Sequence, residues 1–477
     1  MLKISDNNYF ETMPIACHTK HVKYGSTFVA IKGIKEDGAS YIPNALAHGA
    51  TKIVAQEDAI ISEDIKKLIE KNNATLEFVA DARLALAQLS AKASGYAHKQ
   101  LKIIGITGTK GKTSTTFILE HILQKAGYNT ASISTVHNKI NNTIIKSSLT
   151  TEQPDYLHHF FKCCVQNNVE FVVMEVSAQA LSLHRVADLE FDAIIFTNFA
   201  QEHGEFYESL EDYFAAKCKI FDQLKTNGLA FINCDDAWGR KILNAHPKFN
   251  SLGIVNPANM SANIVNAKKT LDLLVTHKNK AYKVNCPSIF GYFNTYNILA
   301  AFSVSNKLGV SIEECTKHME SFTGIPGRLE LYTLKNGARC FIDYAHNPSS
   351  YKAALSTLRQ MTDDLILVFG AGGERDHERR PIMGGIASQI ADTIILTSDN
   401  PRTEDPNGIL EDIISGILPE NRHKIIKELD RKIAIQKACT MAKNTSVITI
   451  LGKGPDEYQI VGNIKTVFSE KEILATY

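Results

Sequence analysis

Residues 103–113 carry the residue types that hold the phosphates of a nucleotide. This segment runs from an apolar, strand-like stretch through glycines into a helical pattern, and it includes Gly108, Gly111, Lys112 and Thr113. Glycines let backbone amides approach a phosphate closely, and the positive end of the following helix adds attraction. Lys112 can reach the β- and γ-phosphates, and the Thr113 hydroxyl can ligate Mg²⁺. The segment therefore predicts a binding site for a nucleoside triphosphate.

The spacing of these glycines departs from the usual phosphate-loop pattern G-x-x-x-x-G-K-[ST]. Ile106 stands five residues before Gly111, and the glycine lies one position earlier, at Gly105. A glycine-rich turn without a ligand is therefore the alternative interpretation. The lysine and threonine directly after Gly111, between a strand-like run and a helical pattern, favour nucleotide binding.

The elements that would position this loop belong to a central α/β domain, expected over residues 99–330. Apolar runs, several rich in β-branched residues, alternate with helical patterns, as buried parallel strands do. These runs are Lys102–Thr107, Phe171–Val176, Ala193–Thr197 and Leu229–Asn233. The pair Pro326–Gly327 lies between a helical stretch and a strand-like run, so the domain is expected to end near Glu330.

Two further α/β domains are expected on either side of the central one. Residues 1–98 hold short apolar runs separated by alanine-rich helical stretches, which predicts a small α/β domain. Residues 331–477 repeat the strand and helix alternation and are expected to form a doubly wound, Rossmann-like domain. Its predicted strands are Leu365–Phe369, Thr393–Thr397 and Ser446–Leu451, and its predicted helices are Asn347–Gln360, Arg380–Gln389 and Arg431–Ala442.

Length and composition indicate an ordinary globular protein of several domains. The 477 residues exceed the roughly 250–300 that one core accommodates. Lys plus Arg number 52 and Asp plus Glu 51, so there is no global field to attract nucleic acid or an anionic membrane. Nine scattered cysteines fit a reducing cytosol, and neither a signal peptide nor a membrane-spanning run is recognisable. We expect a cytoplasmic monomer without membrane insertion or nucleic-acid binding.

An ordered set of motifs gives the sequence a resemblance to a known family. The motifs are TGTKGKT at 107–113, LTT at 149–151, MEVS at 174–177, RV at 185–186, FTN at 196–198, His203, AAK at 215–217, NCDD at 233–236, GYFNTYN at 291–297, PGRLE at 326–330, DYAHNP at 343–348, GGERD at 372–376, DNPRTEDP at 399–406 and GKG at 452–454. In these motifs the chain resembles the Mur ligase family over nearly its whole length. The same resemblance accounts for the offset glycine of the phosphate loop.

Within that family the sequence is most similar to the MurE type, because of the segment DNPR at 399–402. The resemblance implies an ATP- and Mg²⁺-dependent ligase that joins meso-diaminopimelate to the D-glutamate γ-carboxylate of UDP-N-acetylmuramoyl-L-alanyl-D-glutamate. An acyl phosphate would be the intermediate. Arg402 would recognise the distal carboxylate of diaminopimelate, since a guanidinium binds a carboxylate bidentately and repels the distal ammonium of lysine. A solvated loop charge is the alternative interpretation of Arg402.

The resemblance also assigns the residues that would bind ATP and metal. The ATP set is Gly108, Thr109, Lys110, Gly111, Lys112, Thr113, Ser114, Asn294, Asn297, Arg328 and Asp343. The metal set is Thr113, Glu175, His203 and Lys217, and the catalytic set is Lys112, Glu175, His203, Lys217 and Arg328. Lys217 corresponds to a carbamylated lysine (N6-carboxylysine) of the family. Its own local sequence, DYFAAKCKIF, reads as that of a lysine on a helix surface.

Two more sets follow from the resemblance. The UDP-muramyl substrate would contact Thr19, Lys20, Thr150, Thr151, Ser177 and Arg185. Diaminopimelate would contact Arg375, Asp399, Asn400, Pro401, Arg402, Gly452 and Asp456. Capping of strand ends is the alternative for the hydroxyls, and a turn residue is the alternative for Asp456.

The chain departs from the family pattern at four places. His18-Thr19-Lys20 stands where Asp-Ser-Arg is usual, and Ser177-Ala178-Gln179 replaces Ser-Ser-His. Glu202 replaces an aspartate, and Pro455-Asp456 replaces the His-Glu of GKGHE. These changes predict a tuned site and not an inactive one, because Glu202 and Asp456 keep the local negative charge.

Three other functions remain as alternatives. A lysine-adding MurE would be expected to lack Arg402, and a folylpolyglutamate synthase would have no need of the DNPR segment. A non-catalytic nucleotide-binding scaffold would not need Lys112, Glu175, His203, Lys217 and Arg328 together.

Overall fold

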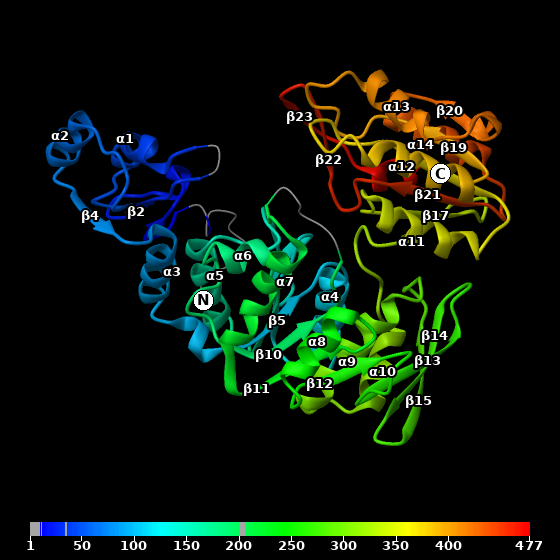
Figure 1. The fold of residues 1–477 in the computed structure, drawn as a ribbon, viewed down its shortest axis with the longest axis horizontal. Coiled ribbons are helices and arrows are strands. Elements are labelled where there is room, and N and C mark those ends of the chain that lie inside the picture. The colour runs from blue at the N-terminus through cyan, green and yellow to red at the C-terminus, as the bar shows by residue number, and fades with distance from the viewer. Residues whose placement is uncertain (1–9, 11, 34–35, 201–205) are drawn as a thin grey trace. The chain divides into compact units, whose positions relative to one another are not determined.

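The computed structural model describes Phe10 and residues 12–33, 36–200 and 206–477, which form two compact units (Figure 1). The first unit comprises Met1–Ser261 with Tyr296–Cys315, and the second comprises Ala262–Thr295 with Thr316–Tyr477. The α/β class is confirmed, and the sheets fall into three domains as expected. The boundaries after residues 98 and 330 stay predictions.

The N-terminal domain is built on a parallel sheet in the order β1-β2-β3-β4. The strands are β1 (Ile15–Ala16), β2 (Thr27–Ala30), β3 (Lys52–Gln56) and β4 (Thr75–Val79), and the helices are α1 (Ile42–Ala47), α2 (Glu63–Lys71) and α3 (Ala82–Ala93), with short 3₁₀ turns η1 (Thr19–His21), η2 (Gly38–Tyr41) and η3 (Ala97–Gln100). Asp81 begins α3 because its carboxylate accepts the amides of Arg83 and Leu84. The predicted apolar runs of this domain are confirmed as β2, β3 and β4.

The central sheet of the first unit has the order β12-β11-β10-β5-β9-β6-β7-β8. Its strands are β5 (Lys102–Thr107), β6 (Thr130–Ile133), β7 (His137–Ile140), β8 (Thr143–Lys146), β9 (Phe171–Glu175), β10 (Phe191–Phe196), β11 (Leu224–Asn233) and β12 (Asn250–Gly253). The pairs from β12 to β6 are parallel, whereas β7 and β8 add an antiparallel edge that sequence patterning missed. Edge strands carry exposed polar positions, so they lack the continuous apolar run of a buried strand.

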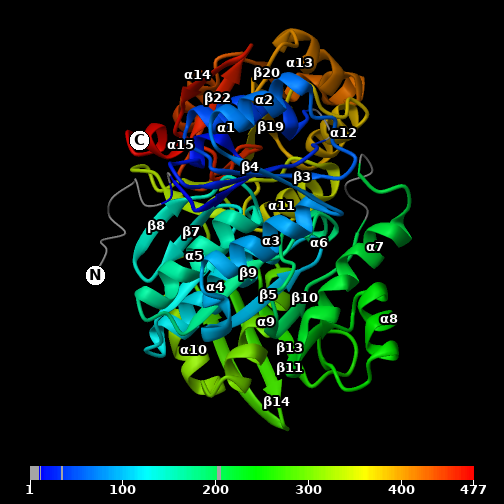
Figure 2. The ribbon, with the colours of Figure 1, turned by 90° about the vertical axis from the view of Figure 1, so that its left-hand side faces the viewer.

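Helices cover this sheet on both faces (Figure 2). They are α4 (Lys112–Lys125), α5 (Pro154–Gln166), α6 (Ala178–Ser182), α7 (Leu210–Cys218), the 3₁₀ turn η4 (Lys219–Gln223) and α8 (Ala237–Ala245). Because β5 pairs with β9 at Ile106 and Glu175, and with β10 at Thr107 and Phe196, these three strands end side by side. Loops that follow neighbouring parallel strands therefore meet at one edge of the sheet, where ligands bind in such folds.

The second unit holds a hairpin and a doubly wound sheet. The hairpin is formed by β14 (Leu271–His277) and β15 (Lys280–Cys286), and it is preceded by β13 (Met260–Asn266), whose first residues pair in parallel with β12. Most of α9 (Asn294–Lys307) belongs to the first unit, and α10 (Ile312–Glu320) begins in the first unit and ends in the second. The doubly wound sheet has the order β16-β17-β21-β18-β19-β20. Its strands are β16 (Glu330–Thr333), β17 (Arg339–Asp343), β18 (Leu365–Phe369), β19 (Thr393–Leu396), β20 (Ile425–Lys427) and β21 (Val447–Leu451).

Two apolar clusters show that helices pack on both faces of this sheet. One cluster takes residues from α11 (Pro348–Arg359), α12 (Arg379–Ile390) and α13 (Pro406–Ser415). The other takes residues from α14 (Arg431–Met441) and α15 (Glu470–Leu474). The ribbon β22 (Tyr458–Val461) with β23 (Ile464–Val467) follows β21. The predicted Rossmann-like fold of this domain is confirmed.

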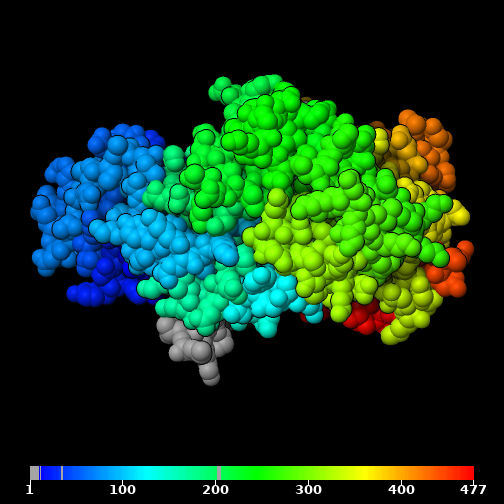
Figure 3. All heavy atoms as spheres, turned by 90° about the horizontal axis from the view of Figure 1, so that it is seen from below, coloured from blue at the N-terminus to red at the C-terminus, as the bar shows by residue number. Residues whose placement is uncertain are grey.

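A buried histidine pair lies where η3 meets α5 in the first unit. The rings of His98 and His158 are 5.1 Å apart between centroids, and both side chains are buried. Neither nitrogen of His158 has a hydrogen-bond partner within the described residues. The space-filling view shows only the outer surface of this part of the first unit, coloured light blue to blue-green (Figure 3). Burial, with a smaller effect from His98, lowers the pKa of His158 to about 3.

This pair predicts loss of stability in mild acid. The unfolded chain takes up a proton at His158 below about pH 6.5, whereas the folded chain does so only near about pH 3, so the free energy of unfolding falls between these values. At about pH 5 the loss should be about 2 kcal/mol. Urea unfolding of His158→Leu at neutral pH and at about pH 5 should show a smaller difference than the wild type. His423→Leu, which changes an exposed histidine, is the control and should keep the wild-type difference. An unchanged acid sensitivity in His158→Leu would contradict this assignment.

None of the helices in the described ranges is long and apolar enough to cross a membrane.

Candidate active site

The loop between β5 and α4 has a backbone that only glycine can follow at two positions. Gly108 has φ +136° and Gly111 has φ +87°, both in the region that favours glycine. A Cβ on Gly108 would lie 2.0 Å from Thr197 Oγ1, and one on Gly111 would lie 2.4 Å from Asn297 Oδ1. The loop thus packs directly on residues that arrive from β10 and α9.

The side chain of Asn198 fixes the shape of this loop. Its Oδ1 accepts the amide of Lys110 at 2.9 Å and its Nδ2 donates to the carbonyl of Lys110 at 3.0 Å. The backbone carbonyl of Asn198 accepts the amide of Thr109 at 2.9 Å, and Thr197 Oγ1 donates to the carbonyl of Lys110 at 2.6 Å. Sequence reasoning gave Thr197 and Asn198 no role, although their place at the end of β10, beside the end of β5, was a usable signal.

Removing the hydrogen bonds between the Asn198 side chain and the backbone of Lys110, which we call the clamp, should weaken nucleotide binding without unfolding the protein. Asn198→Ala deletes two hydrogen bonds to the loop and frees its backbone, so the affinity for ATP should fall roughly tenfold. Asn250→Ala is the matched control, because Asn250 also bonds a backbone carbonyl in the same sheet, on β12. Calorimetric titration with a non-hydrolysable ATP analogue measures both variants. Equal affinities for the two variants would show that the clamp does not shape the binding site.

Lys112 and its neighbours begin helix α4 beneath the loop. Lys112 Nζ donates to the carbonyls of Gly108 and Thr109, each at 2.9 Å. Thr113 and Ser114 are buried in the first turn. Thr115 Oγ1 donates to Asn297 Oδ1 at 3.2 Å. The structure therefore brings Asn297 to the phosphate loop, whereas Asn294 at the start of α9 donates from Nδ2 to the carbonyl of Phe290 at 2.7 Å.

Glu175 lies buried at the end of β9 and is held by Thr135. The backbone amide of Thr135 donates to one carboxylate oxygen at 3.0 Å, and its hydroxyl donates to the other at 3.1 Å. The same hydroxyl lies 3.1 Å from the hydroxyl of Thr150. Thr135 was missed from the sequence, yet it links the predicted metal ligand Glu175 to the predicted substrate residue Thr150.

Lys217 is not on the surface of α7, so the interpretation from its local sequence is wrong. Its side chain is buried, its Nζ donates to the carbonyl of Gly108 at 2.9 Å, and its Nζ lies 4.5 Å from the ring centre of Tyr213. The reason is tertiary, because α7 places this side of the helix against the phosphate loop. The local sequence pattern did not reveal this burial, and the role that the family resemblance assigns to Lys217 stays a prediction.

The structure describes only some of the predicted metal ligands, because His203 lies outside the described residues. Within those residues no group of three or more His, Cys, Asp and Glu side chains is arranged around a metal position. The chemistry of Thr113 and Glu175 nevertheless fits Mg²⁺, which prefers hard oxygen donors and retains several waters. Thr113 lies in the first turn of α4 and Glu175 is the last residue of β9, so both lie at the edge of the sheet where β5 and β9 end.

Four of the predicted muramyl contacts form one connected group. Thr151 Oγ1 donates to the carbonyl of Glu175 at 2.9 Å and accepts the amide of Ser177 at 3.0 Å. Arg185 Nη1 donates to the carbonyl of Thr151 at 2.9 Å. Together with Thr150, these residues lie next to the glutamate of β9. The structure therefore brings Thr150, Thr151, Ser177 and Arg185 together.

A second arginine, Arg83 at the start of α3, was missed from the sequence. Burial and the nearby charge of Arg83 lower the pKa of Arg185. Arg83 Nη2 donates to the carbonyl of Lys32 at 3.0 Å. Two guanidinium groups close together are typical of a site for an anion. Thr19 and Lys20 lie on η1, which His18 caps by accepting the amide of Lys20 at 3.1 Å. Within the described residues no hydrogen bond joins them to Arg185.

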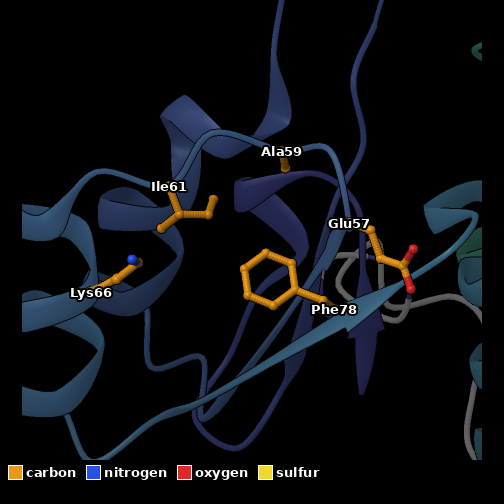
Figure 4. A pocket seen from close by; sticks show the side chains of 5 residues that line it. All are labelled: Glu57, Ala59, Ile61, Lys66 and Phe78. Carbon is orange, nitrogen blue, oxygen red and sulfur yellow. The ribbon is translucent and has the colours of Figure 1, made fainter.

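A hollow of the N-terminal domain lies away from these residues. A pocket of about 320 Å³ is lined by Glu57, Ala59, Ile61, Lys66 and Phe78, with the Phe78 ring facing Ile61 (Figure 4). None of the predicted site residues lines it.

In the second unit, Asp343 at the end of β17 holds the turn that contains Arg328. Its two carboxylate oxygens accept the amides of Leu329 and Ala345, each at 2.7 Å. Burial raises the pKa of Asp343, and the charge of Arg328 opposes this effect. The Arg328 guanidinium lies 4.9 Å from the ring centre of Tyr344. Arg328 and Asp343 are therefore neighbours, as their assignment to one binding site requires.

The residues predicted to bind diaminopimelate gather around the loop after β19. Arg402 has φ +53° and donates from Nη1 to the carbonyls of Gly373 at 2.7 Å and Asn400 at 3.4 Å. A Cβ on Gly372 would lie 3.3 Å from Arg402 Nη1 and 3.6 Å from Arg375 Cγ, so both arginines border this glycine. The loops GGERD and DNPR thus form one surface.

The loop after β21 completes this surface. Lys453 Nζ lies 3.3 Å from Asp399 Oδ1, and a Cβ on Gly452 would lie 2.4 Å from Asp399 Oδ2. Burial raises the pKa of Asp456, to which Tyr458 hydrogen-bonds. Glu457 is exposed, whereas Asp456 is half-buried and its pKa is influenced by the charges of Lys453 and Asp399. Pro455 packs on Gly327, where a Cβ would lie 2.4 Å from Pro455 Cδ, and it therefore has a structural role in place of the usual histidine.

The fold, together with the glycine-rich loop at the sheet edge where β5, β9 and β10 end, defines a class of protein. It is an α/β protein with a phosphate loop in its central domain, followed by a doubly wound domain. Three family models match the chain: Mur ligase family, catalytic domain over residues 15–94, Mur ligase middle domain over 106–305, and Mur ligase, glutamate ligase domain over 327–454. The chain belongs to the Mur ligase family.

Curated relatives and solved structures agree with this membership. A protein of Clostridium botulinum named UDP-N-acetylmuramoyl-L-alanyl-D-glutamate–2,6-diaminopimelate ligase is 36% identical over 475 residues, which are 98% of this chain and 95% of the relative. A protein of the same name from Aquifex aeolicus is 35% identical, over 96% of this chain and 92% of its own. A solved structure of that name is similar with a TM-score of 0.66 and 25% identity, covering 98% of this chain and 94% of its own.

Proposed function

We propose that this protein joins meso-diaminopimelate to the γ-carboxylate of UDP-N-acetylmuramoyl-L-alanyl-D-glutamate at the expense of ATP, in the synthesis of peptidoglycan precursors. One observation carries the proposal: Thr135 connects Glu175, beside the phosphate loop, to Thr150 of the predicted substrate group. A nucleotide site and a substrate site that share hydrogen bonds suit a direct transfer between the two ligands. The names of the full-length relatives support the same reaction.

The proposed chemistry has two steps. The γ-carboxylate attacks the γ-phosphorus of ATP, so that ADP leaves and an acyl phosphate forms. The free amine of diaminopimelate then attacks the acyl carbon, phosphate leaves, and the amine loses its proton to complete the amide. Activation is necessary because a carboxylate by itself is a poor electrophile.

Individual residues have distinct tasks in this proposal. The loop amides and Lys112 hold the phosphates, and Arg185 with Arg83 attracts the anionic groups of the muramyl substrate. Thr113 and Glu175, with His203, would hold Mg²⁺, which offsets the repulsion between a carboxylate and a triphosphate. Asn297 lies beside the loop and would contact the nucleotide, together with Arg328 and Asp343.

Lys217 would act as a carbamate rather than as an ammonium. Its Nζ is buried beside the carbonyl of Gly108, close to where phosphates and metal would lie. Carbamylation would exchange a positive charge for an anionic oxygen donor suited to Mg²⁺. Intact-mass measurement in bicarbonate buffer should show one added carboxyl group that Lys217→Ala lacks. A single unmodified species in both samples would refute this role.

The cellular setting follows from the same reaction. The nucleotide-linked precursor and ATP are cytoplasmic compounds, so we place the protein in the cytoplasm, acting as a monomer on small molecules without nucleic acid or membrane insertion. Sedimentation analysis of the purified chain would test the monomeric state, and a stable dimer would refute it.

The decisive experiment is phosphate release from ATP with Mg²⁺ and the muramyl dipeptide nucleotide, with meso-diaminopimelate, L-lysine or L-ornithine supplied in parallel. Mass spectrometry identifies the product. Turnover with meso-diaminopimelate alone is the expected result. Turnover with lysine instead would keep the ligase and change its substrate, and ATP binding without turnover would favour a nucleotide-binding scaffold.

A further inference from the structure

Lys453, in the loop after β21, is a fully buried cation that contacts Asp399 and Asn400 of the DNPR loop. Its side chain has no solvent exposure. The Nζ atom donates to Asn400 Oδ1 at 3.0 Å and to the carbonyl of Tyr458 at 2.8 Å, and it lies 3.3 Å from Asp399 Oδ1. An ammonium has three N–H donors, so these three oxygens satisfy it completely.

These bonds fix which way the Asn400 amide faces. Asn400 Oδ1 accepts both from Lys453 and from the backbone amide of Ile460, at 2.9 Å. Two donors can converge only on the amide oxygen, so the orientation of this amide is determined by its partners. Among the described residues, Asn400 Nδ2 has no hydrogen-bond partner. Its two N–H groups are therefore left to donate to a ligand, and a carboxylate is the acceptor that suits two parallel donors.

The charges around Lys453 point to the same ligand class. The negative charges of Asp399 and Asp456 both interact with the positive charge of Lys453. Arg431, another buried cation nearby, forms an ion pair with Glu470 at 2.7 Å. Without Lys453, the carboxylates of Asp399 and Asp456 would leave excess negative charge beside Asn400 and Arg402. Such a surface would repel a carboxylate and attract an ammonium.

We propose that Lys453 is a positioning residue for amino-acid selection, which turns the Asn400 amide donors toward the distal carboxylate of the substrate and balances Asp399 and Asp456. The inference rests on the proposed function and deepens it. Arg402 binds the same carboxylate directly, and Lys453 acts through Asn400. The pocket therefore accepts a diamino acid with a second carboxylate better than one that ends in an ammonium.

The test compares Lys453→Met, which removes both hydrogen bonds and charge, with Lys453→Gln, which keeps a donor and removes the charge. Lys465→Met is the matched control, because Lys465 is exposed and lies 3.5 Å from the centre of the Tyr458 ring. Lys453→Met should raise the KM for meso-diaminopimelate by roughly 10- to 100-fold. The preference for diaminopimelate over lysine should fall with it, while the KM values for ATP and the muramyl substrate stay the same. Lys453→Gln should lie between Lys453→Met and the wild type, and Lys465→Met should match the wild type.

Two outcomes would overturn the inference: an unchanged preference in Lys453→Met, or an equal loss for all three substrates, which indicates a structural role. If Lys453→Met does not fold, the pair Asp399→Asn with Lys453→Met removes the unpaired charge and is measured in the same way. Calorimetry of amino-acid binding, in the presence of a non-hydrolysable ATP analogue and the muramyl substrate, needs no turnover. Absence of wild-type turnover would therefore refute the proposed function alone, and the binding data would still decide the role of Lys453.

Discussion

Replacing Lys112 with methionine should reduce turnover by roughly 10²- to 10³-fold. The Lys112 ammonium lies against the carbonyls of Gly108 and Thr109, at the start of α4, where the phosphates of ATP would bind. Charge on the transferred phosphoryl group is stabilised chiefly by positioned cations, and methionine keeps the length of the side chain while removing the charge. Phosphate release at saturating substrates measures the effect.

The control for this variant is Lys125→Met, at the exposed C-terminal end of the same helix. It removes one lysine from α4 without approaching the loop, so its turnover should match the wild type. The unfolding midpoints of all three proteins should be close, because the bonds of Lys112 to the carbonyls of Gly108 and Thr109 lie within the loop and not in the core of the domain. Wild-type turnover in Lys112→Met would exclude this loop as the site of phosphoryl transfer.

The second large effect is expected for Arg402→Ala, which should reduce the preference for meso-diaminopimelate over lysine by roughly 10²-fold. Arg402 donates from Nη1 to the carbonyls of Gly373 and Asn400, and its Nε and Nη2 have no hydrogen-bond partner within the described ranges. These two nitrogens can bind one carboxylate bidentately. The positive φ of Arg402 is costly for a non-glycine residue, and backbone bonds to Ile460 and Gly462 maintain it.

Two companion variants separate recognition from loop structure. Arg402→Lys keeps the charge but cannot bind a carboxylate through two parallel N–H groups, so most of the preference should still be lost. Arg240→Ala removes an arginine that likewise donates to two backbone carbonyls, and it should leave the preference unchanged. The ratio of kcat/KM for the two amino acids is the measured quantity. An unaltered ratio in both Arg402 variants would show that Arg402 is a solvated loop charge and does not select the amino acid.

Much of the fold could be predicted from local patterns. Strands β5, β9, β10, β18, β19 and β21 were recognised because each is buried on both faces and therefore reads as a continuous apolar run. Strands β7, β8, β22 and β23 were not recognised, since none of them is a continuous buried run. Residues of β7 alternate between half-buried and buried positions, those of β8 between half-buried and exposed positions, and β22 and β23 are half-buried or exposed. The phosphate loop was recognisable because its chemistry lies in a few consecutive residues.

The sequence by itself therefore determined the α/β class, the nucleotide loop and, through its ordered motifs, membership of the family. The tertiary structure decided which distant residues serve the same site: Asn198 shapes a loop 88 positions away, Lys217 lies under Gly108, and Lys453 orients Asn400. The physical reason is that helix and strand patterns depend on near neighbours in the chain. Contacts between loops depend on the order of strands in the sheet, which places the ends of β5, β9 and β10 together.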